Sequence, residues 1–317
     1  MQPFDLVLDW VPNVQFAGPC WALANGLYRD VGIDLRLVPW VEDGRTIVEK
    51  TLSRDVAAAG SSEDNLVIKA RAQDGIAVRG LAAMFLTTPL VVMSLPETRI
   101  NALVDLRGKR VAMHCDGIRI LEALLDDAGI ARSELEIGEV THDLGNLTSG
   151  RWDAVQGYAV SEPLELAIRG VAVNTLTLRG PAIHPYAQVI FASDAAVATA
   201  PKLYRNMLDA TFRGWRAAVN DPQGAARAIH ATGMPMADAG REQEALACVA
   251  GLVQGKAPDQ MRGLGVIDPV RWASNVAAYT RAGIVPSGTA ALDSLDTGLW
   301  QAVALPAVSV GHGGIRS

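Results

Sequence analysis

The sequence predicts an α/β protein made of two lobes, and three observations lead to this class. Short β-rich runs alternate with helical segments through the first third of the chain, and a second series of the same kind begins near Asp105. The chain has 317 residues, of which 50% are hydrophobic and 20% charged, so it is too long for one compact core. Two domains are therefore expected.

The first unit is expected to begin with a strand and then to alternate. Its first helix should stop near Gly32, because glycine accepts the positive φ that a helix end favours. Strands are expected at Phe4–Asp9, Asp34–Val38 and Val56–Gly60, and helices at Pro19–Tyr28, Gly44–Leu52 and Asp64–Ala72. Such alternation predicts a mostly parallel sheet with right-handed crossovers.

The second unit begins at "DLRGKRVAMHCDG", where Asp105 can cap a short turn. Strands are expected at Arg110–His114, Leu135–Val140 and Ala154–Tyr158, and helical segments at Ile118–Ala128, near Asp143–Ser149 and after Pro163. From Pro201 onward the chain is expected to be helical, since apolar residues recur on one helix face until Asp221-Pro222 ends the run. The last segment, "VGHGGIRS", lacks periodicity, and we expect it to be frayed.

Charge and motifs exclude several function classes. The chain carries 28 basic and 34 acidic residues, a net charge of −6, and no basic stripe, so nucleic acid is not an expected partner. Three separated cysteines and five scattered histidines suggest neither a disulfide framework nor a metal site. The sequence contains no phosphate loop, GxGxxG, HExxH or GxSxG motif, and we expect no cofactor.

No apolar run has the length of a membrane span, and the first predicted strand begins almost at Met1. These observations are compatible with two cellular compartments. The periplasm is expected if a signal peptide was removed, and the cytoplasm is expected if Met1 is the native start.

Polar and aromatic residues recur where predicted strands stop. These positions are Asp9-Trp10 with Asn13, Ser61-Ser62, Thr87-Thr88, His114-Cys115-Asp116, and Tyr158 with Glu162. In open α/β sheets, ligands bind beyond the carboxyl ends of strands. We therefore expect a small-molecule site where the two units face each other.

Three segments carry a resemblance to a known family: "LDWVPNVQFAGPCWALANGLYRDVGIDLRLVPW", "LSRDVAAAGSSEDNLVIKARAQDGIAV" and "DLRGKRVAM". Over roughly the first two-thirds of the chain, the sequence resembles the NMT1/THI5-like family, and most closely its bacterial substrate-binding proteins for a thiamine precursor. The resemblance implies a periplasmic-binding-protein type II fold, with residues 1–88 plus 195–317 in lobe 1 and residues 89–194 in lobe 2. The helical C-terminal third would pack on lobe 1, and the lobes would close on the ligand by hinge motion.

The family also has an enzyme branch, the yeast-type pyrimidine synthase of thiamine biosynthesis. That branch carries a lysine for pyridoxal phosphate, a histidine and a CCCFC cluster for iron. Alignment places Gly60 at the lysine, Asp64 at the histidine, and residues 182–186 (AIHPY) over the cysteine cluster. Since a Schiff base needs an amine and a soft iron site needs thiolates, we favour the binding branch, serving an ABC importer.

The expected ligand is an aminopyrimidine-like thiamine precursor or another planar heterocycle. Trp10 offers a flat face for stacking, and Asp9 or Asn13 can hydrogen-bond ring nitrogens or an amine. The alternative is that Trp10 lies in the core and Asp9 caps a turn. Glu162 can accept from an exocyclic amine, or it can simply begin a helix before Pro163.

The other candidate ligand residues also have structural alternatives. Tyr158 and Tyr186 can wall the ring or pack the edge between the lobes. Ser61 and Ser62 can hold a polar group or cap the next helix, and Thr87 and His114 are strand-end donors or structural residues. Two further functions stay open beside pyrimidine binding: a synthase-like enzyme, and a diverged sulfonate-binding or cytosolic ligand-sensing protein.

Overall fold

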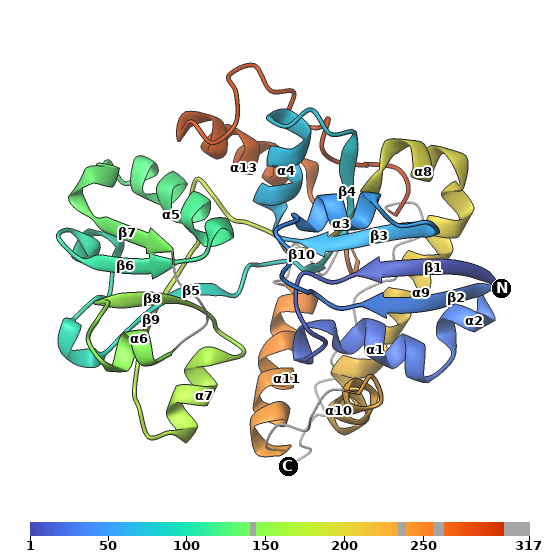
Figure 1. Cartoon of the computed structure of the whole chain (residues 1–317), viewed down its shortest axis with the longest axis horizontal. Coiled ribbons are helices and arrows are strands. Elements are labelled where there is room, and N and C mark those ends of the chain that lie inside the picture. Colours follow the sequence, from blue (N-terminus) through green and yellow to red (C-terminus); the bar gives the residue numbers. More distant parts are fainter. Residues whose placement is uncertain (140–143, 234–238, 256–262, 301–317) are drawn as a thin grey trace, which may run out of the picture.

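The computed structural model describes residues 1–139, 144–233, 239–255 and 263–300, and it contains two α/β lobes, each built on its own five-stranded sheet (Figure 1). The predicted frayed end, "VGHGGIRS", lies outside the described residues, as does His142. The two-lobe α/β class predicted from the sequence is confirmed.

The first sheet has the strand order β2-β1-β3-β10-β4. Its strands are β1 (Gln2–Val7), β2 (Ile33–Val38), β3 (Ala57–Ser62), β4 (Val78–Phe85) and β10 (Ala187–Ser193). Strand β1 pairs in parallel with β2 and β3, whereas β10 runs antiparallel to β3 and β4. The first lobe therefore takes one of its inner strands from far along the chain.

The second sheet has the order β7-β6-β8-β5-β9. Its strands are β5 (Leu90–Ser94), β6 (Arg110–Met113), β7 (Glu136–Glu139), β8 (Ala154–Tyr158) and β9 (Asn174–Thr177). Strand β6 is parallel to β7 and β8, and β5 is antiparallel to β8 and β9. Four of the five strands in each sheet therefore run in the same direction, as the prediction of a mostly parallel sheet requires, and one strand in each is reversed. The reversed strands, β5 and β10, are the two that follow the crossovers between the lobes.

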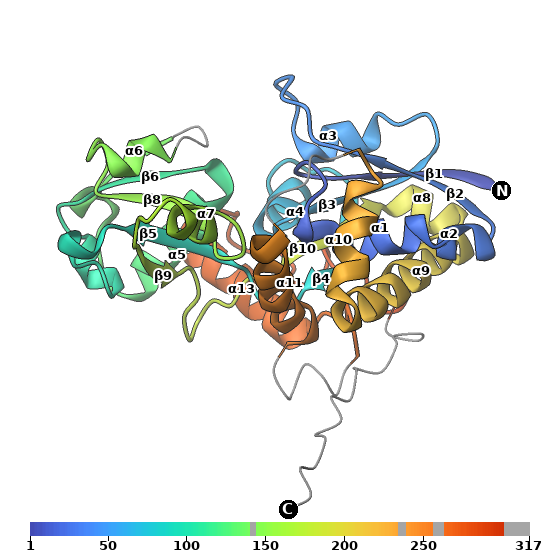
Figure 2. The ribbon, with the colours of Figure 1, turned by 90° about the horizontal axis from the view of Figure 1, so that it is seen from below.

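Helices of various lengths cover the faces of both sheets (Figure 2). In the first half of the chain they are η1 (Val14–Phe16), α1 (Ala17–Ala24), α2 (Leu27–Asp30), α3 (Ile47–Leu52), α4 (Asp64–Ala72), η2 (Pro96–Thr98), η3 (Leu103–Leu106), α5 (Cys115–Asp127), η4 (Arg132–Glu134) and α6 (Gly145–Thr148). The later ones are α7 (Glu162–Ile168), α8 (Asp194–Thr199), α9 (Pro201–Asn220), α10 (Pro222–His230), α11 (Ala239–Gln254) and α13 (Pro269–Arg281).

One predicted helix is divided in two. The chain forms α1 and α2 where a single helix from Pro19 to Tyr28 was expected, because Gly26 adopts a left-handed φ of 75° between them. The long helix predicted from the apolar spacing after Pro201 is confirmed as α9, and α10 begins at Pro222 with Asp221 as its N-cap.

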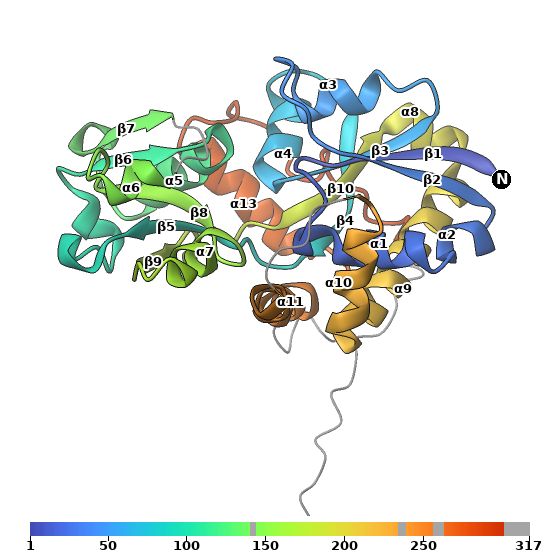
Figure 3. The same ribbon diagram turned by 60° about the horizontal axis from the view of Figure 1, so that its bottom comes forward.

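Helices α9 and α10 pack on the first lobe. Helix α11 packs on the first lobe and also contacts α7 of the second, and α13 packs against α4 of the first lobe and α5 of the second (Figure 3). We propose that residues 1–88 plus 195–317 form the first lobe and residues 89–194 the second, except that β10 (Ala187–Ser193) also belongs to the first lobe. This strand pairs with β3 and β4 in the first sheet, so the return crossover ends before it.

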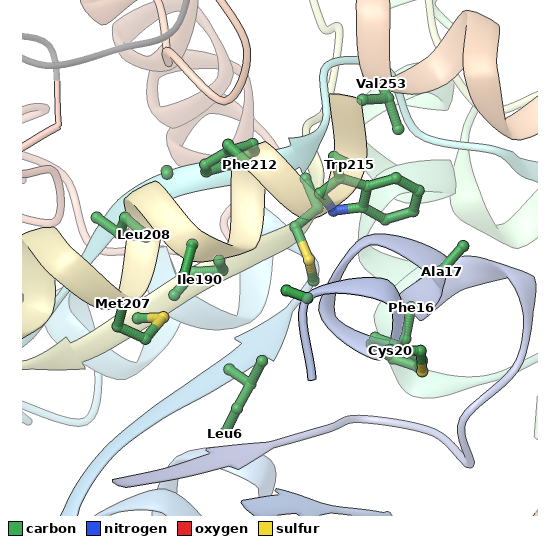
Figure 4. Close-up of a cluster of buried hydrophobic side chains, with 14 of the residues drawn as sticks. Leu6, Phe16, Ala17, Cys20, Ile190, Met207, Leu208, Phe212, Trp215 and Val253 are labelled. Atoms are coloured by element: carbon green, nitrogen blue, oxygen red, sulfur yellow. The ribbon is translucent and has the colours of Figure 1, made fainter. Parts of the chain in front are cut away.

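Helices α1 and α9 cross at a pair of glycines in the core of the first lobe, beside Trp215 (Figure 4). A Cβ atom on Gly214 would lie 2.2 Å from the carbonyl oxygen of Gly18, and a Cβ on Gly18 would lie 2.3 Å from the Trp215 ring. Neither contact is sterically possible, so this close crossing requires glycine at both positions.

We expect Gly214→Ala to destabilise the protein by about 1–3 kcal/mol, the usual cost of overpacking a core. The urea midpoint of unfolding measures this loss. Gly251→Ala is the matched control, because a Cβ there meets no atom within 4 Å and alanine favours the helix α11. Equal midpoints for the two variants would contradict the tight crossing.

Candidate functional site

The candidate site lies where strands of the first sheet end opposite the second lobe. Asp9 and Trp10 follow β1, Trp40 follows β2, and Ser61 lies at the end of β3. These three strands are parallel, so their carboxyl ends meet at one edge of the sheet. A backbone hydrogen bond of 3.3 Å from Trp40 N to Trp10 O joins two of the strand ends.

Hydrogen bonds join this edge to the second lobe. The Tyr158 hydroxyl, at the end of β8, donates to Glu63 Oε1 at 3.2 Å. From β10, Gln188 Nε2 contacts Asp9 Oδ2 at 3.3 Å and the Tyr158 oxygen at 3.5 Å. We call Asp9, Glu63, Asp116, Tyr158 and Gln188 the inter-lobe cluster, since Asp116 at the start of α5 acts electrostatically on both other carboxyl groups.

Burial dominates the electrostatics of the inter-lobe cluster. Loss of hydration raises the pKa of Asp9 to about 7, and the Asp116 carboxylate adds to this effect. Burial also raises the pKa of Glu63 well above its ordinary value, followed by repulsion from Asp116 and Asp9. No lysine or arginine is among the main influences on either pKa. The cluster therefore brings three acidic groups together in a place that disfavours their ionised forms.

Several buried atoms at this edge have no hydrogen-bond partner among the described residues: Asp9 Oδ1, Ser61 Oγ, Asn65 Oδ1 and Gln188 Oε1. The orientation of both amides follows from their neighbours, because Asn65 Nδ2 donates to the Asp116 carbonyl at 2.9 Å and Gln188 Nε2 faces acceptors. The amide oxygens of Asn65 and Gln188 can only accept, and Asp9 Oδ1 accepts when its carboxyl group is ionised. A ligand that satisfies them must bring N–H or O–H donors.

Gln188 also has an unusual backbone. Its φ is 51°, a left-handed conformation that only one other non-glycine residue adopts in the described part of the chain. The residue is the second of β10 and is 2% exposed. Strain of this kind persists where the surroundings fix it, and it is concentrated at binding sites.

The structure brings three predicted site residues together: Asp9, Ser61 and Tyr158. Trp10 lies at the same edge, partly buried, and packs against the core of the first lobe. Ser62 follows Ser61 in β3, so its side chain points to the opposite face of the sheet.

The remaining candidates lie apart from the inter-lobe cluster or have local partners. Asn13 Oδ1 accepts from Gln15 N and caps η1, and Glu162 Oε2 accepts from Tyr158 N at 2.7 Å. His114 is the N-cap residue of α5. Thr87 Oγ1 lies 3.0 Å from His184 Nε2, between the two crossovers. Tyr186 is buried beneath the Arg271 guanidinium.

Reasoning from the sequence did not select Glu63, Asn65 or Gln188. Glu63 and Asn65 directly follow the Ser61-Ser62 pair, so their position after a buried strand was an available signal. Gln188 had none, because its role depends on the pairing of β10 with β3 across the chain.

Two absences hold for the part of the chain that the structure describes. No group of three or more histidine, cysteine, aspartate or glutamate side chains is placed to hold a metal ion there. Within the same ranges, none of the helices combines the length and hydropathy needed to cross a bilayer. A surface pocket of about 290 Å³ beside Arg71, Gly288 and Asp293 is separate from the inter-lobe cluster.

Two α/β lobes joined by two crossovers, with buried polar groups between them, define the periplasmic-binding-protein fold. The chain belongs to the NMT1/THI5-like family, whose model matches residues 13–225. The family and the fold predicted from the sequence are both confirmed.

Three comparisons show which known proteins the chain is similar to. It is 25% identical over 218 residues to a riboflavin-binding protein of Chloroflexus aurantiacus, covering 68% of this chain and 62% of that protein. It is 26% identical over 160 residues to a formylaminopyrimidine-binding protein of Halalkalibacterium halodurans, covering 50% and 48%. The crystal structure of the periplasmic aliphatic sulphonate binding protein SsuA from Escherichia coli superposes with a TM-score of 0.69 at 13% identity, covering 93% and 97%. The chain thus spans about half to three-fifths of the two curated relatives.

Proposed function

We propose that the protein is a solute-binding protein of the ABC-importer type and that it captures a small planar nitrogen heterocycle between its lobes. The observation that carries this proposal is the set of buried acceptors at the edge of the first sheet. Asp9 Oδ1, Asn65 Oδ1 and Gln188 Oε1 are enclosed without a partner among the described residues. Buried polar atoms of this kind are normally satisfied, and a donor-bearing ligand would satisfy them.

The charge of the site supports a neutral or cationic ligand over an anion. Asp9 and Glu63 lie close to Asp116, and repulsion among these groups is relieved by a ligand that donates hydrogen bonds or carries positive charge. A sulfonate would need cationic or N–H donors. Arg119, the nearest arginine along α5, instead donates to the carbonyl of Cys115 within its own helix at 3.1 Å.

Two ligand sources share this chemistry. An aminopyrimidine offers an exocyclic amine, and a flavin offers a ring N–H and side-chain hydroxyls. One relative is a riboflavin-binding protein and the other a formylaminopyrimidine-binding protein, so each is named for one of these two chemical types. Trp10 would stack on the ring while Asp9 accepts from its edge, and Tyr158 would close over it from the second lobe. An importer permease would then receive the ligand from the protein.

A thermal-shift and native mass-spectrometry screen tests the proposal. The panel contains an aminopyrimidine, thiamine, riboflavin, pyridoxal phosphate and an alkyl sulfonate. A ligand that binds only the native state raises the melting temperature. At a free ligand concentration of 100 times Kd, it adds about 2.7 kcal/mol to the free energy of unfolding. We expect a shift with the aminopyrimidine or with riboflavin, and these two arms distinguish the ligand sources. A shift with the sulfonate alone, or with none of the panel, would contradict the proposal.

Replacing the stacking residue should separate binding from stability. We expect Trp10→Ala to lose about tenfold or more in affinity for the planar ligand, since ring stacking contributes about 0.5–1.5 kcal/mol beyond area burial. The matched control is Trp21→Ala, a partly buried tryptophan of α1 that contacts Gly224 of α10. Isothermal titration of both variants should show lost affinity only for Trp10→Ala. Lost stability with unchanged affinity would place Trp10 in the core alone.

A further inference from the structure

Helix α13 touches both lobes. It packs against α4 in the first lobe and α5 in the second, and it lies between them in Figure 3. At its last residue, Arg281 Nη2 lies 4.0 Å from Asp127 Oδ1, at the end of α5. A helix from the C-terminal third of the chain therefore bridges two bodies that must move apart if a ligand is to enter.

One side chain of α13 binds both crossovers. Arg271 Nε donates to the His184 carbonyl at 2.7 Å, and Nη2 donates to the carbonyls of Leu86 at 2.5 Å and Pro185 at 3.2 Å. Leu86 belongs to the outgoing crossover, between β4 and β5, and the other two residues belong to the return crossover, between β9 and β10. The guanidinium also lies 3.8 Å from the centre of the Tyr186 ring.

The crossovers are also joined directly to each other. Thr88 N donates to Pro185 O at 3.0 Å, and Thr87 Oγ1 lies 3.0 Å from His184 Nε2. Thr87, expected from the sequence to be a ligand residue, thus has a partner in the opposite crossover. The two connections form one ribbon under the arginine.

A second side chain of α13 ties the return crossover to the first lobe. His184 N donates to Asn275 Oδ1 at 2.9 Å, and Asn275 Nδ2 donates back to His184 O at 3.0 Å. The same Nδ2 reaches Asp64 Oδ2 at 2.9 Å, at the start of α4. Asn275 is fully buried. The crossovers therefore cannot shift relative to α13 without breaking buried hydrogen bonds.

We propose that Arg271 fixes the pivot of lobe movement and that α13, through its contact with α5, limits how far the lobes open. Arginine suits this role because its planar, rigid fork holds several carbonyl oxygens in fixed geometry. The role is one of positioning, and it rests on the proposed solute-binding function. By setting the fraction of closed molecules, α13 sets the apparent affinity for ligand.

The chain provides its own pair of labelling sites for the test. Cys115 on α5 and Cys248 on α11 are exposed and lie in different lobes, whereas Cys20 is buried. Nitroxide labels on the two exposed thiols report the distance between the lobes by pulsed electron paramagnetic resonance, without any ligand. The labelled, unsubstituted protein is the reference.

We expect Arg271→Met to give a longer and broader distance distribution, because the side chain keeps its bulk and loses every donor. Arg271→Lys should restore the reference only in part. Arg213→Met, on α9 of the first lobe and paired there with Asp209, is the matched control and should leave the distribution unchanged. If the closed fraction falls from about a half to about a twentieth, the apparent Kd rises about tenfold.

Arg281→Gln tests the same proposal if the Arg271 variants do not fold. Arg281 is half exposed, so its replacement should let the lobes open without disturbing the core. Unchanged distances in folded Arg271→Met and Arg281→Gln proteins would overturn the pivot. The outcome is separate from that of the ligand screen. Longer distances in the variants, with no ligand found in the screen, would support the pivot and leave the solute-binding function unsupported. Unchanged distances, with a ligand found, would support solute binding and overturn the pivot.

Discussion

In the double variant Asp9→Asn, Glu63→Gln, we expect the melting temperature at pH 8 to rise by several degrees while the affinity for ligand falls. Burial raises the pKa of Asp9 to about 7 and that of Glu63 well above its usual value, so ionising either group destabilises the folded state. A neutral amide removes this cost. For Asp9 alone the gain is on the order of 2–4 kcal/mol, with allowance for its partial exposure.

The gain depends on pH with a definite sign. An aspartate with a pKa near 4 in the unfolded chain and about 7 in the folded one binds more protons when folded between these values. The stability of the unsubstituted protein therefore falls as pH rises from about 4 to 7. The Asp9 part of the double variant's advantage should be absent near pH 4 and complete above pH 7, and the Glu63 part should have the same sign, because the pKa of Glu63 is also raised.

Urea unfolding at pH 4.5, 6 and 8 measures this dependence, with the exposed Glu97→Gln as control. Loss of two charge-assisted hydrogen bonds should lower ligand affinity by about 10- to 100-fold. A double variant that is destabilised at pH 8 would show that Asp9 and Glu63 support the fold and are not held there for a ligand.

The adjacent carboxylate should behave in the opposite way. We expect Asp64→Ala to destabilise the protein by about 3–5 kcal/mol, because three buried donors would lose their acceptor. Asp64 Oδ2 accepts from Tyr186 N and Asn275 Nδ2, and Oδ1 accepts from the Tyr279 hydroxyl, all at 2.9 Å. Burial raises the pKa of Asp64 only to about 6, so it is mainly ionised at neutral pH.

Asp64→Asn is the control for this prediction. Its amide oxygen can accept from the two N–H donors, and its amine can face the tyrosine oxygen, so we expect a loss much smaller than that of alanine. Chemical denaturation of both variants at pH 7 measures the difference. Similar losses for alanine and asparagine would show that the charge, and not the hydrogen-bond geometry, stabilises this position.

The contrast between Glu63 and Asp64 gives each residue a role. Both are buried acids in the turn after β3, with 4% and 0% of their surfaces exposed. The three donors to Asp64 offset part of the cost of burying its charge, so its pKa is raised only to about 6. Glu63 receives a hydrogen bond at 3.2 Å from Tyr158 of the second sheet and a long one at 3.5 Å from Thr88 of the outgoing crossover. Glu63 is thus an acid whose ionisation is unfavourable in the folded protein and which faces the other lobe, as expected of a group that binds a ligand.

Local pattern predicted much of the fold. The expected helix Asp64–Ala72 and strand Ala154–Tyr158 match α4 and β8 to the residue, because each has clear boundary signals in the sequence. Strands β4, β5 and β10 were not predicted. Each is a nearly continuous apolar run, which periodicity cannot distinguish from a buried helix.

The same limit applies to the site. Asp9, Ser61 and Tyr158 could be selected because each ends a recognisable strand. The partners that hold them, Glu63 and Gln188, act through contacts between segments about 95 and 179 residues apart, which no local pattern encodes. Sequence reasoning therefore located the edge of the site and one of its acids, Asp9, and missed the second acid, Glu63, and the amide, Gln188, that contact the selected residues.

The position of β10 between β3 and β4 has a consequence for how the chain is made. The strands of the second sheet all lie between Leu90 and Thr177, whereas the first sheet needs residues up to Ser193 to join its two parts. A chain leaving the ribosome can complete the second lobe first. Until β10 emerges, β3 and β4 each lack the strand that pairs with both of them. The sheet of the N-terminal lobe is therefore the last to be completed.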